Sequence, residues 1–298
     1  MSEPIELPSF AKINLALRVI RKREDGYHDL ATVFQTVSLA DRLTFAPADG
    51  LTLECDDPNI PTAGDNLIIR AAEALRREFK VDAGARIRLE KRIPSPGGLG
   101  GGSSNAAIAL IGLRALWDLP VTIPGLQPLA ERLGSDVPFF LYGGTALGTC
   151  RGTEIEQLPD IDAKFIVIAV PDVSVSTADA FGGLRQEPLT TEDVNRILLN
   201  YRFCSGLTGT NGLLIENDFE NSVFAMHPSI ALAKQILLSY GAYVAGLSGS
   251  GASVFGIFDN EETRQTALKA LGNESNWRSF AVAAVSRAQY REALSQVL

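Results

Sequence analysis

The chain has 298 residues, 46% of them hydrophobic, and a formal net charge of −8. This length suffices for about two domains, and the acidic balance excludes a broad nucleic-acid surface, which needs clustered Lys and Arg. The longest apolar runs fall well short of the roughly 18 residues that a membrane span needs. We therefore expect neither nucleic-acid nor membrane partners.

The N-terminus and the cysteines indicate a compartment. Residues Met1 to Pro4 contain no basic segment followed by an apolar one, so no secretion signal is indicated. Cys55, Cys150 and Cys204 are scattered, odd in number and without the spacing of a metal site. Free thiols are typical of a reducing compartment. We expect a cytoplasmic protein, and the sequence leaves open whether it is a monomer or a homodimer.

The first half of the chain predicts strands followed by helices. From Leu7 to Val19 apolar residues alternate with others, as in a half-buried strand, so that Lys12 and Asn14 share a face. Asp25-Gly26 predicts a turn before a second strand from Ala31 to Phe45. The next predicted elements are a helix from Asp65 to Phe79, a strand from Ala85 to Leu89 and a helix from Ser104 to Trp117.

A glycine-rich segment over residues 94–107 separates the last two of these elements. It reads Pro-Ser-Pro-Gly-Gly-Leu-Gly-Gly-Gly-Ser-Ser-Asn-Ala-Ala, with five glycines in six positions. Glycines let the backbone approach a ligand closely, and the N–H groups at a helix start attract anions. A flexible linker is the alternative, but linkers rarely lead directly into a helix with Ser103, Ser104 and Asn105 as possible caps. The segment predicts a phosphate-binding loop.

Two common phosphate loops do not fit this segment. The chain contains no Gly-Lys-Ser or Gly-Lys-Thr, which excludes the usual P-loop. A dinucleotide fingerprint also fits poorly, because Ser103 stands where that motif needs its third glycine and no acidic residue ends a strand about 20 residues later. A nucleotide kinase or ligase with an unusual loop remains.

The second half predicts a different element order, with a boundary near residue 160. Its pattern is strand, helices, two strands, helix and strand, which is a split β-α-β-β-α-β unit. The elements are strands 165–170, 242–247, 253–258 and 280–286, and helices 191–200, 229–240 and 261–271. A second glycine-rich loop, residues 248–252, lies between the middle strands; a simple hairpin connection is its alternative interpretation. We expect an α+β protein with units 1–160 and 161–298.

Few residues offer catalytic chemistry. With two histidines and no Gly-x-Ser-x-Gly, a Ser-His-Asp hydrolase is disfavoured. Phosphoryl transfer needs charge neutralisation and a carboxylate that accepts the hydroxyl proton. Asp136, in Ser-Asp-Val-Pro at a helix start, is the best candidate, although it could simply cap that helix. Lys12 could stabilise the phosphoryl charge, although a lone strand lysine is usually solvated. Tyr27 and His28 could hold a flat heterocycle or be structural.

Three segments form an ordered set of motifs: Pro8 to Leu15, Pro94 to Ala107 and Leu247 to Ala252. In these motifs and their order, over nearly its whole length, the chain resembles the GHMP kinases, the superfamily of galactose, homoserine, mevalonate and phosphomevalonate kinases. The resemblance implies a ribosomal-S5-like N-terminal domain, a ferredoxin-like C-terminal domain, and transfer of phosphate from ATP, with Mg²⁺, to an alcohol. Within the family, four segments resemble those of members whose substrate is a small cytidylyl compound, a CDP-linked methylerythritol: Ala11 to Leu15, Asp25 to His28, Gly98 to Asn105 and Ser135 to Phe139.

The resemblance also implies residue roles. Asp136 would be the general base, Lys12 its charged neighbour, and Asn14 would orient the substrate. Tyr27 and His28 would hold the cytidine, and Phe181 would stack on the cytosine. The ATP phosphates would lie against Pro94, Gly97, Gly98, Leu99, Gly100, Gly101, Gly102, Ser103, Ser104 and Asn105, the adenine near Asn66, Leu67 and Lys91, and the substrate against Gly249, Ser250 and Gly251.

Metal ligands and two rival functions stay open. No compact carboxylate cluster is visible, so Mg²⁺ would be held by ATP oxygens and water, with or without a loop serine. A GHMP kinase for homoserine or mevalonate is one rival, disfavoured by Tyr27 and His28, because those substrates carry no base. A non-catalytic nucleotide-binding protein is the other, disfavoured by the presence of both Lys12 and Asp136.

Overall fold

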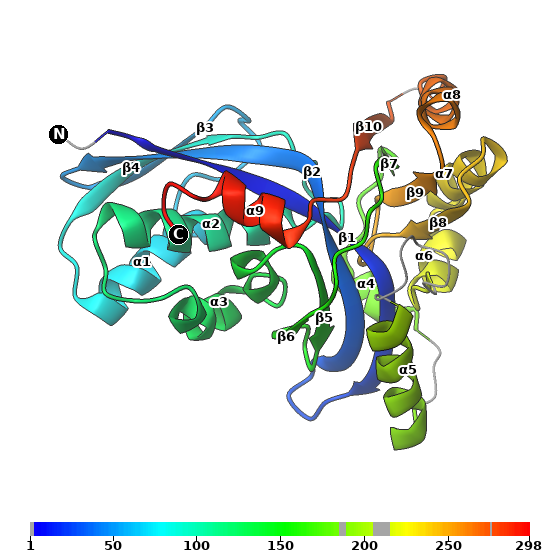
Figure 1. Cartoon of the computed structure of the whole chain (residues 1–298), viewed down its shortest axis with the longest axis horizontal. Coiled ribbons are helices and arrows are strands. Elements are labelled where there is room, and N and C mark those ends of the chain that lie inside the picture. Colours follow the sequence, from blue (N-terminus) through cyan, green and yellow to red (C-terminus); the bar gives the residue numbers. More distant parts are fainter. Residues whose placement is uncertain (1–2, 185–188, 205–214, 275) are drawn as a thin grey trace.

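The computed structural model describes residues 3–184, 189–204, 215–274 and 276–298. Two sheets lie side by side, each with its own helices (Figure 1). The first sheet has the order β3-β4-β2-β5-β6, with β1 also paired to β2. Its strands are β1 (Ile5–Lys22), β2 (His28–Ala48), β3 (Leu51–Cys55), β4 (Gly84–Glu90), β5 (Thr145–Thr149) and β6 (Glu154–Gln157).

A long antiparallel hairpin, β1–β2, forms the centre of this sheet and runs to its edge facing the second unit (Figure 1). The predicted turn is confirmed: Gly26 has φ +85°, a conformation that glycine adopts without strain, and Arg23 N–H donates to the Tyr27 carbonyl at 2.8 Å. Because β2 is long, it pairs with β4 along one part and with β5 along another.

The expectation of a half-buried β1 is wrong over residues 11–17, which are buried on both faces. Helix α2 (Gly101–Leu116) covers one face of the hairpin, and the second sheet packs against the other through a shared core that includes Ile13, Val33, Ile168 and Phe255. The alternation itself is correct, because Lys12 and Asn14 do share a face.

Helices α1 (Leu67–Phe79), α2 and α3 (Gln127–Leu133) lie on one side of the first sheet (Figure 1). Asn66 caps α1 by accepting the Ile68 N–H at 2.8 Å. Helix α2 is apolar all round and buried from Ser104 to Leu113, as expected for a helix inside a core. Two short 3₁₀ helices, η1 (Pro124–Leu126) and η2 (Pro138–Leu141), complete this layer.

The second unit confirms the predicted split β-α-β-β-α-β pattern. Its sheet has the order β10-β7-β9-β8, with every neighbouring pair antiparallel. The strands are β7 (Phe165–Val170), β8 (Val244–Leu247), β9 (Val254–Phe258) and β10 (Arg278–Val282). The helices are α4 (Thr177–Gly182), α5 (Thr191–Cys204), α6 (Glu220–Met226), α7 (Pro228–Ser239) and α8 (Glu261–Leu271).

The end of the chain returns to the first unit. Helix α9 (Arg287–Ala293) lies against the helical layer of the first sheet (Figure 1). Val285, Tyr290, Leu294 and Val297 belong to the core of that layer, and Tyr290 Oη donates to the Phe140 carbonyl at 2.5 Å. The boundary near residue 160 stays a prediction, but the segment after β10 packs with the first unit. In the described part of the chain, no helix is both long and apolar enough to span a bilayer.

Candidate active site

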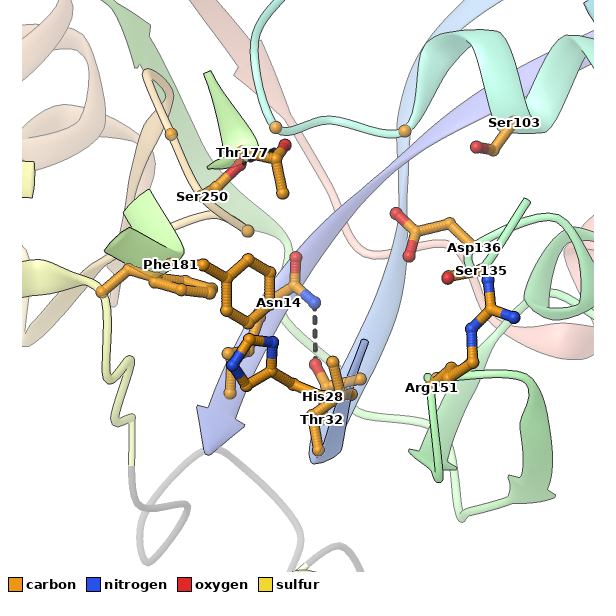
Figure 2. A pocket seen from close by; sticks show the side chains of 18 of the residues that line it. Asn14, His28, Thr32, Ser103, Ser135, Asp136, Arg151, Thr177, Phe181 and Ser250 are labelled. Carbon is orange, nitrogen blue, oxygen red and sulfur yellow. Dashed lines mark hydrogen bonds between the residues drawn. The ribbon is translucent and has the colours of Figure 1, made fainter. Parts of the chain in front are cut away.

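A cavity of about 630 Å³ opens between the two units. The hairpin β1–β2, the glycine-rich segment, the residues before η2 and the turn after β5 contribute one part of its lining. Helix α4 and the second glycine-rich loop contribute the other part, from the second unit (Figure 2). The cavity therefore collects residues that are far apart in the sequence.

Lys12 and Asp136 face one another in this cavity. Lys12 Nζ lies 3.3 Å from Asp136 Oδ2, and it donates to Asn14 Oδ1 at 2.6 Å and to the Gly98 carbonyl at 3.0 Å. The lysine side chain is only 3% exposed, so it is not solvated as strand lysines usually are. Asn14 in turn donates to Thr32 Oγ1 at 2.7 Å, which fixes its orientation (Figure 2).

Asp136 does not cap the helix that it precedes. The residue at the N-cap of η2 is Val137, without a side-chain capping bond, and Pro138 occupies the first turn as predicted. The Asp136 side chain is instead turned to the cavity, opposite Asn14 (Figure 2). A carboxylate that is not needed as a cap is available to a bound hydroxyl.

The glycine-rich segment is held between β1 and the second glycine-rich loop. Gly98 has φ +73°, and its carbonyl accepts from both Lys12 Nζ and Ser248 Oγ at 3.0 Å. The carbonyls of Gly97 and Leu99 accept the backbone N–H groups of Ser253 and Lys12. A Cβ on Gly98 would lie 2.2 Å from the Ser248 carbonyl oxygen. Only glycine permits this approach of two backbones.

Helix α2 begins earlier than predicted, which changes the part played by the polar residues after the glycines. Gly100, at φ +70°, is the N-cap residue, and no side chain caps the helix. Ser103, Ser104 and Asn105 therefore lie inside the first turns rather than at the cap. Of the three, Ser103 lines the cavity, whereas Ser104 and Asn105 are buried behind it.

A buried polar network lies behind the glycine-rich segment. Asn105 Nδ2 donates to Ser9 Oγ at 2.9 Å and to Asp41 Oδ2 at 3.0 Å, and Ser9 donates to Ser104 Oγ at 2.8 Å. Asp41, fully buried, also accepts from Lys91 Nζ at 2.8 Å. This network ties β1, β2 and the strand-to-loop connection to the start of α2.

The residues expected near the adenine do not line the cavity. Lys91 is engaged with Asp41, Asn66 caps α1, and Leu67 lies beside the glycine-rich segment, with its Cδ1 at 3.8 Å from the place of a Cβ on Gly102. Of the phosphate-loop residues, Gly97, Gly98, Gly100 and Ser103 line the cavity, whereas Pro94, Leu99, Gly101, Gly102, Ser104 and Asn105 do not.

The aromatic residues singled out in the sequence all line the cavity. The rings of His28 and Phe181 are stacked, with centroids 4.3 Å apart and planes at 14° (Figure 2). Phe181, on α4, also packs edge-on against Phe219, and Tyr27 lines the cavity while 52% exposed. Burial, and then the nearby charge of Lys22, lower the pKa of His28 below its usual 6.5. His28 is therefore neutral at pH 7.

The second glycine-rich loop contributes Gly249, Ser250 and Gly251 to the lining. Ser250 Oγ lies 3.1 Å from Thr177 Oγ1 at the start of α4, and these two side chains are paired in Figure 2. The Gly249 carbonyl accepts from Asn217 Nδ2 at 2.8 Å. This loop thus joins the glycine-rich segment to the helix that carries Phe181.

Several lining residues were not predicted as site residues from the sequence, and the polar ones among them include Thr32, Arg151 and Thr177. Thr32 and Thr177 lie in unremarkable surroundings, and no local pattern marks them. Arg151 precedes Gly152, and glycine often marks a turn, so a turn signal was present in the sequence. The direction in which Arg151 points, however, depends on the pairing of β5 with β2, which no local sequence pattern specifies. Among the residues that the structure describes, no group of three His, Cys, Asp or Glu side chains could hold a metal ion.

Both units match known sequence families. Residues 66–144 match the GHMP kinases N-terminal domain, and residues 203–276 match the GHMP kinases C-terminal domain. The chain is 42% identical over 292 residues to the 4-diphosphocytidyl-2-C-methyl-D-erythritol kinase of Solibacter usitatus, covering 96% of this chain and 90% of that protein. The chain belongs to the GHMP kinases.

Further GHMP kinase relatives agree with this assignment. The protein of the same name from Bacillus mycoides is 40% identical, covering 88% of this chain and 90% of that protein. A crystal structure of 4-(cytidine 5'-diphospho)-2C-methyl-D-erythritol kinase superposes with a TM-score of 0.77 at 31% identity, covering 95% of this chain and all of that one. A homoserine kinase from Cytophaga hutchinsonii, at 20% identity and TM-score 0.71 over 96% of each chain, shares the fold.

GHMP kinases use ATP as phosphate donor, and the chain is an ATP-dependent small-molecule kinase of this family. The expectation of a two-domain GHMP kinase fold is confirmed.

Proposed function

We propose that the chain transfers the γ-phosphate of ATP to the 2-hydroxyl of 4-diphosphocytidyl-2-C-methyl-D-erythritol, a step in non-mevalonate isoprenoid precursor biosynthesis. One observation carries the proposal: a single cavity contains the Lys12–Asp136 pair and is also lined by the aromatic group, that is, Tyr27 and the stacked rings of His28 and Phe181. The pair suits phosphoryl transfer to an alcohol, and the aromatic group suits a nucleobase. The relatives' names support the same substrate.

The roles of the catalytic pair follow from their geometry. Asp136, 31% exposed toward the cavity, would accept the proton of the attacking hydroxyl as general base. Lys12, fixed by Asn14 and Gly98, would stabilise the negative charge on the transferred phosphoryl group and on the hydroxyl oxygen. Neither group would need to reorganise during the reaction, because each already has its partner.

The glycine-rich segment would bind the ATP phosphates. Its positive-φ glycines bring backbone to the cavity wall at the N-terminus of α2, where a phosphate is favoured by the helix dipole and free N–H groups. Mg²⁺ would be held by phosphate oxygens and water, with Ser103 as the loop hydroxyl that lines the cavity. The bound metal would neutralise phosphate charge during transfer.

The cytosine would bind at the aromatic group. Neutral His28 has one nitrogen donor and one acceptor, which suits the hydrogen-bonding edge of a base. The ring of Phe181 already stacks on a flat heterocycle, His28, and a cytosine would add to this stack or replace that contact. Ser250 and Thr177 would close the cavity above the polyol.

The test is ADP release from the purified protein with ATP and Mg²⁺, using 4-diphosphocytidyl-2-C-methyl-D-erythritol, homoserine or mevalonate at equal concentration. Selective turnover of the cytidylyl compound is the expected result. Turnover of another alcohol would keep the catalytic pair and reject the substrate. ATP binding without turnover of any of the three would reject the proposal as a whole.

A further inference from the structure

Arg151 lines the cavity without a role in the function proposed above. It follows β5 in a turn whose backbone is fixed on both sides: the Cys150 carbonyl accepts the Leu30 N–H at 2.7 Å, and Gly152 N–H donates to the Thr149 carbonyl at 2.9 Å. Cys150 and Gly152 have φ of +57° and +90°. The turn therefore holds Arg151 at a defined point on the wall.

The guanidinium group of Arg151 lies over Tyr27. Its Cζ is 3.7 Å from the centroid of the Tyr27 ring, and its Nε is buried without a hydrogen-bond partner. None of the described carboxylates forms an ion pair with it, although the charge of Asp25 acts on it at longer range. Buried donors are normally satisfied, and a charged fork with free donors suits an anion.

Few cations are available inside the cavity. Among the described residues that line it, Lys12 and Arg151 carry a positive charge at pH 7, since His28 is neutral. The ammonium group of Lys12 already has three oxygen partners: the Asp136 carboxylate, the Asn14 side-chain oxygen and the Gly98 carbonyl. Any further anionic group of a bound molecule would therefore be drawn to Arg151.

The place of Arg151 matches one part of the proposed substrate. Its guanidinium lies over the Tyr27 ring. A Cβ on its neighbour Gly152 would lie 3.8 Å from the Ser135 carbonyl oxygen, and Figure 2 shows Arg151 on the side of the cavity that carries Ser135 and Asp136. Arg151 thus contacts Tyr27, assigned to the cytosine, and lies on the side of the cavity that carries Asp136, assigned to the reacting hydroxyl. In a CDP-linked polyol, the diphosphate lies between those two ends.

We propose that Arg151 binds the diphosphate group of the cytidylyl substrate and thereby determines specificity for diphosphate-linked compounds. The inference rests on the proposed function. Arginine is suited to this contact because its planar fork donates two parallel hydrogen bonds to phosphate oxygens. The face of Tyr27 keeps the fork from rotating freely.

The experiment compares CDP with cytidine as ligands of the wild-type protein, Arg151→Gln and Arg151→Lys, by titration calorimetry. Wild type is expected to bind CDP more tightly than cytidine. In Arg151→Gln the affinity for CDP falls about 10- to 100-fold while that for cytidine is kept, because hydrogen bonds to charged groups are lost. The CDP affinity of Arg151→Lys, which keeps the charge but not the planar guanidinium, is expected to lie between those of the wild type and Arg151→Gln. The variant Arg42→Gln, whose exposed partner Glu6 is on β1, is the matched control.

Kinetics separate the remaining outcomes. Arg151→Gln is expected to raise KM for the cytidylyl substrate about 10- to 100-fold with KM for ATP unchanged. If Arg151→Gln loses affinity for cytidine and CDP equally, Arg151 only positions Tyr27. If the variant raises only the KM for ATP, Arg151 acts on ATP and not on the cytidylyl substrate. Either result overturns the proposal. If the wild type binds CDP and turns over the cytidylyl substrate, and Arg151→Gln does both equally well, the role of Arg151 is rejected and the proposed function stands. If the wild type neither binds CDP nor turns over the substrate, the proposed function is rejected as well.

Discussion

Lys12 and Asp136 form an ion pair of unequal exposure: Nζ and Oδ2 are 3.3 Å apart, yet the lysine side chain is 3% exposed and the aspartate 31%. The cation is fixed in the wall by its three acceptors, whereas the anion reaches into the cavity. This asymmetry lets the carboxylate approach a bound hydroxyl while the ammonium keeps its place. A surface ion pair would offer neither property, because both groups would be solvated and screened.

Asp136→Asn is expected to lower kcat about 100- to 10,000-fold, the range for loss of a general base. The amide has the same shape, so ATP affinity and the unfolding midpoint should change little. Steady-state kinetics with the cytidylyl substrate, together with ATP titration, measure both effects. Asp162→Asn, in an exposed pair with Lys164 outside the cavity, is the control. A kcat within tenfold of wild type would reject the assignment of the base.

Local patterns predicted most of the elements in the described part of the chain. Helix α8 and strand β7 have the bounds expected, and α1 begins at the cap that Asn66 provides. These segments carry their own signals in periodicity and capping. Strands β5 and β6 were missed because each is short, and because β5 pairs with β2, which is distant in sequence, as well as with its neighbour β6. The return of α9 to the first unit likewise depends on contacts that no local pattern specifies.

Predicting the site from the sequence was limited in the same way. The motif residues Lys12, Asp136, Tyr27 and His28 do meet in one cavity, although their roles stay proposals. Lys91 shows what the sequence leaves open: it lies near the glycine-rich segment, and it forms an ion pair with Asp41, a strand residue with no sequence signal. Which buried groups pair is decided by the tertiary structure.

His28 is expected to titrate below pH 6.5, because burial and the charge of Lys22 lower its pKa. The pKa is lower in the folded than in the unfolded chain. The stability that neutral His28 contributes is therefore present above pH 6.5 and lost as pH falls through the folded pKa. NMR of the imidazole protons measures the midpoint, and with two histidines in the chain, His28→Gln assigns the signals. A midpoint above 6.5 would contradict this account.

If His28 binds the cytosine, its protonation should also change the KM for the cytidylyl substrate. KM for the cytidylyl substrate is expected to stay constant from about pH 8 to 7 and to rise only in the acid range where His28 gains its proton. In His28→Gln this acid rise should disappear, because the amide does not titrate there. An acid limb that persists in the variant would assign it to another group.

Gly98→Ala should prevent the two glycine-rich loops from packing. A Cβ there would lie 2.2 Å from the Ser248 carbonyl oxygen and 2.9 Å from that of Gly251, and φ of +73° disfavours any other residue. We expect a loss of about 2 kcal/mol or more in the free energy of unfolding. Gly102→Ala is the contrast: its nearest neighbour would be 3.8 Å away in a helix, so stability should hold or rise by about 0.5–1 kcal/mol. Equal effects of the two changes in thermal unfolding would contradict the packing argument.

Asp41→Asn tests the network behind the phosphate loop. Asp41 is fully buried, and its two oxygens accept from Lys91 Nζ, Asn105 Nδ2 and the N–H groups of Arg92 and Ile93. The amide removes the charge and turns a donor toward Lys91, leaving that cation buried without a counter-charge. Removing one partner of a buried pair lowers stability by about 3–5 kcal/mol.

Urea unfolding measures this loss, and Lys91→Met in the Asp41→Asn background should recover part of it, since the stranded charge is then gone. KM for ATP should rise in Asp41→Asn, because the connection 91–93 leads directly into the glycine-rich segment. Arg132→Gln, which breaks an exposed pair with Glu78, should change stability by less than about 1 kcal/mol. A similarly small effect of Asp41→Asn would show that the glycine-rich segment holds its position without the network.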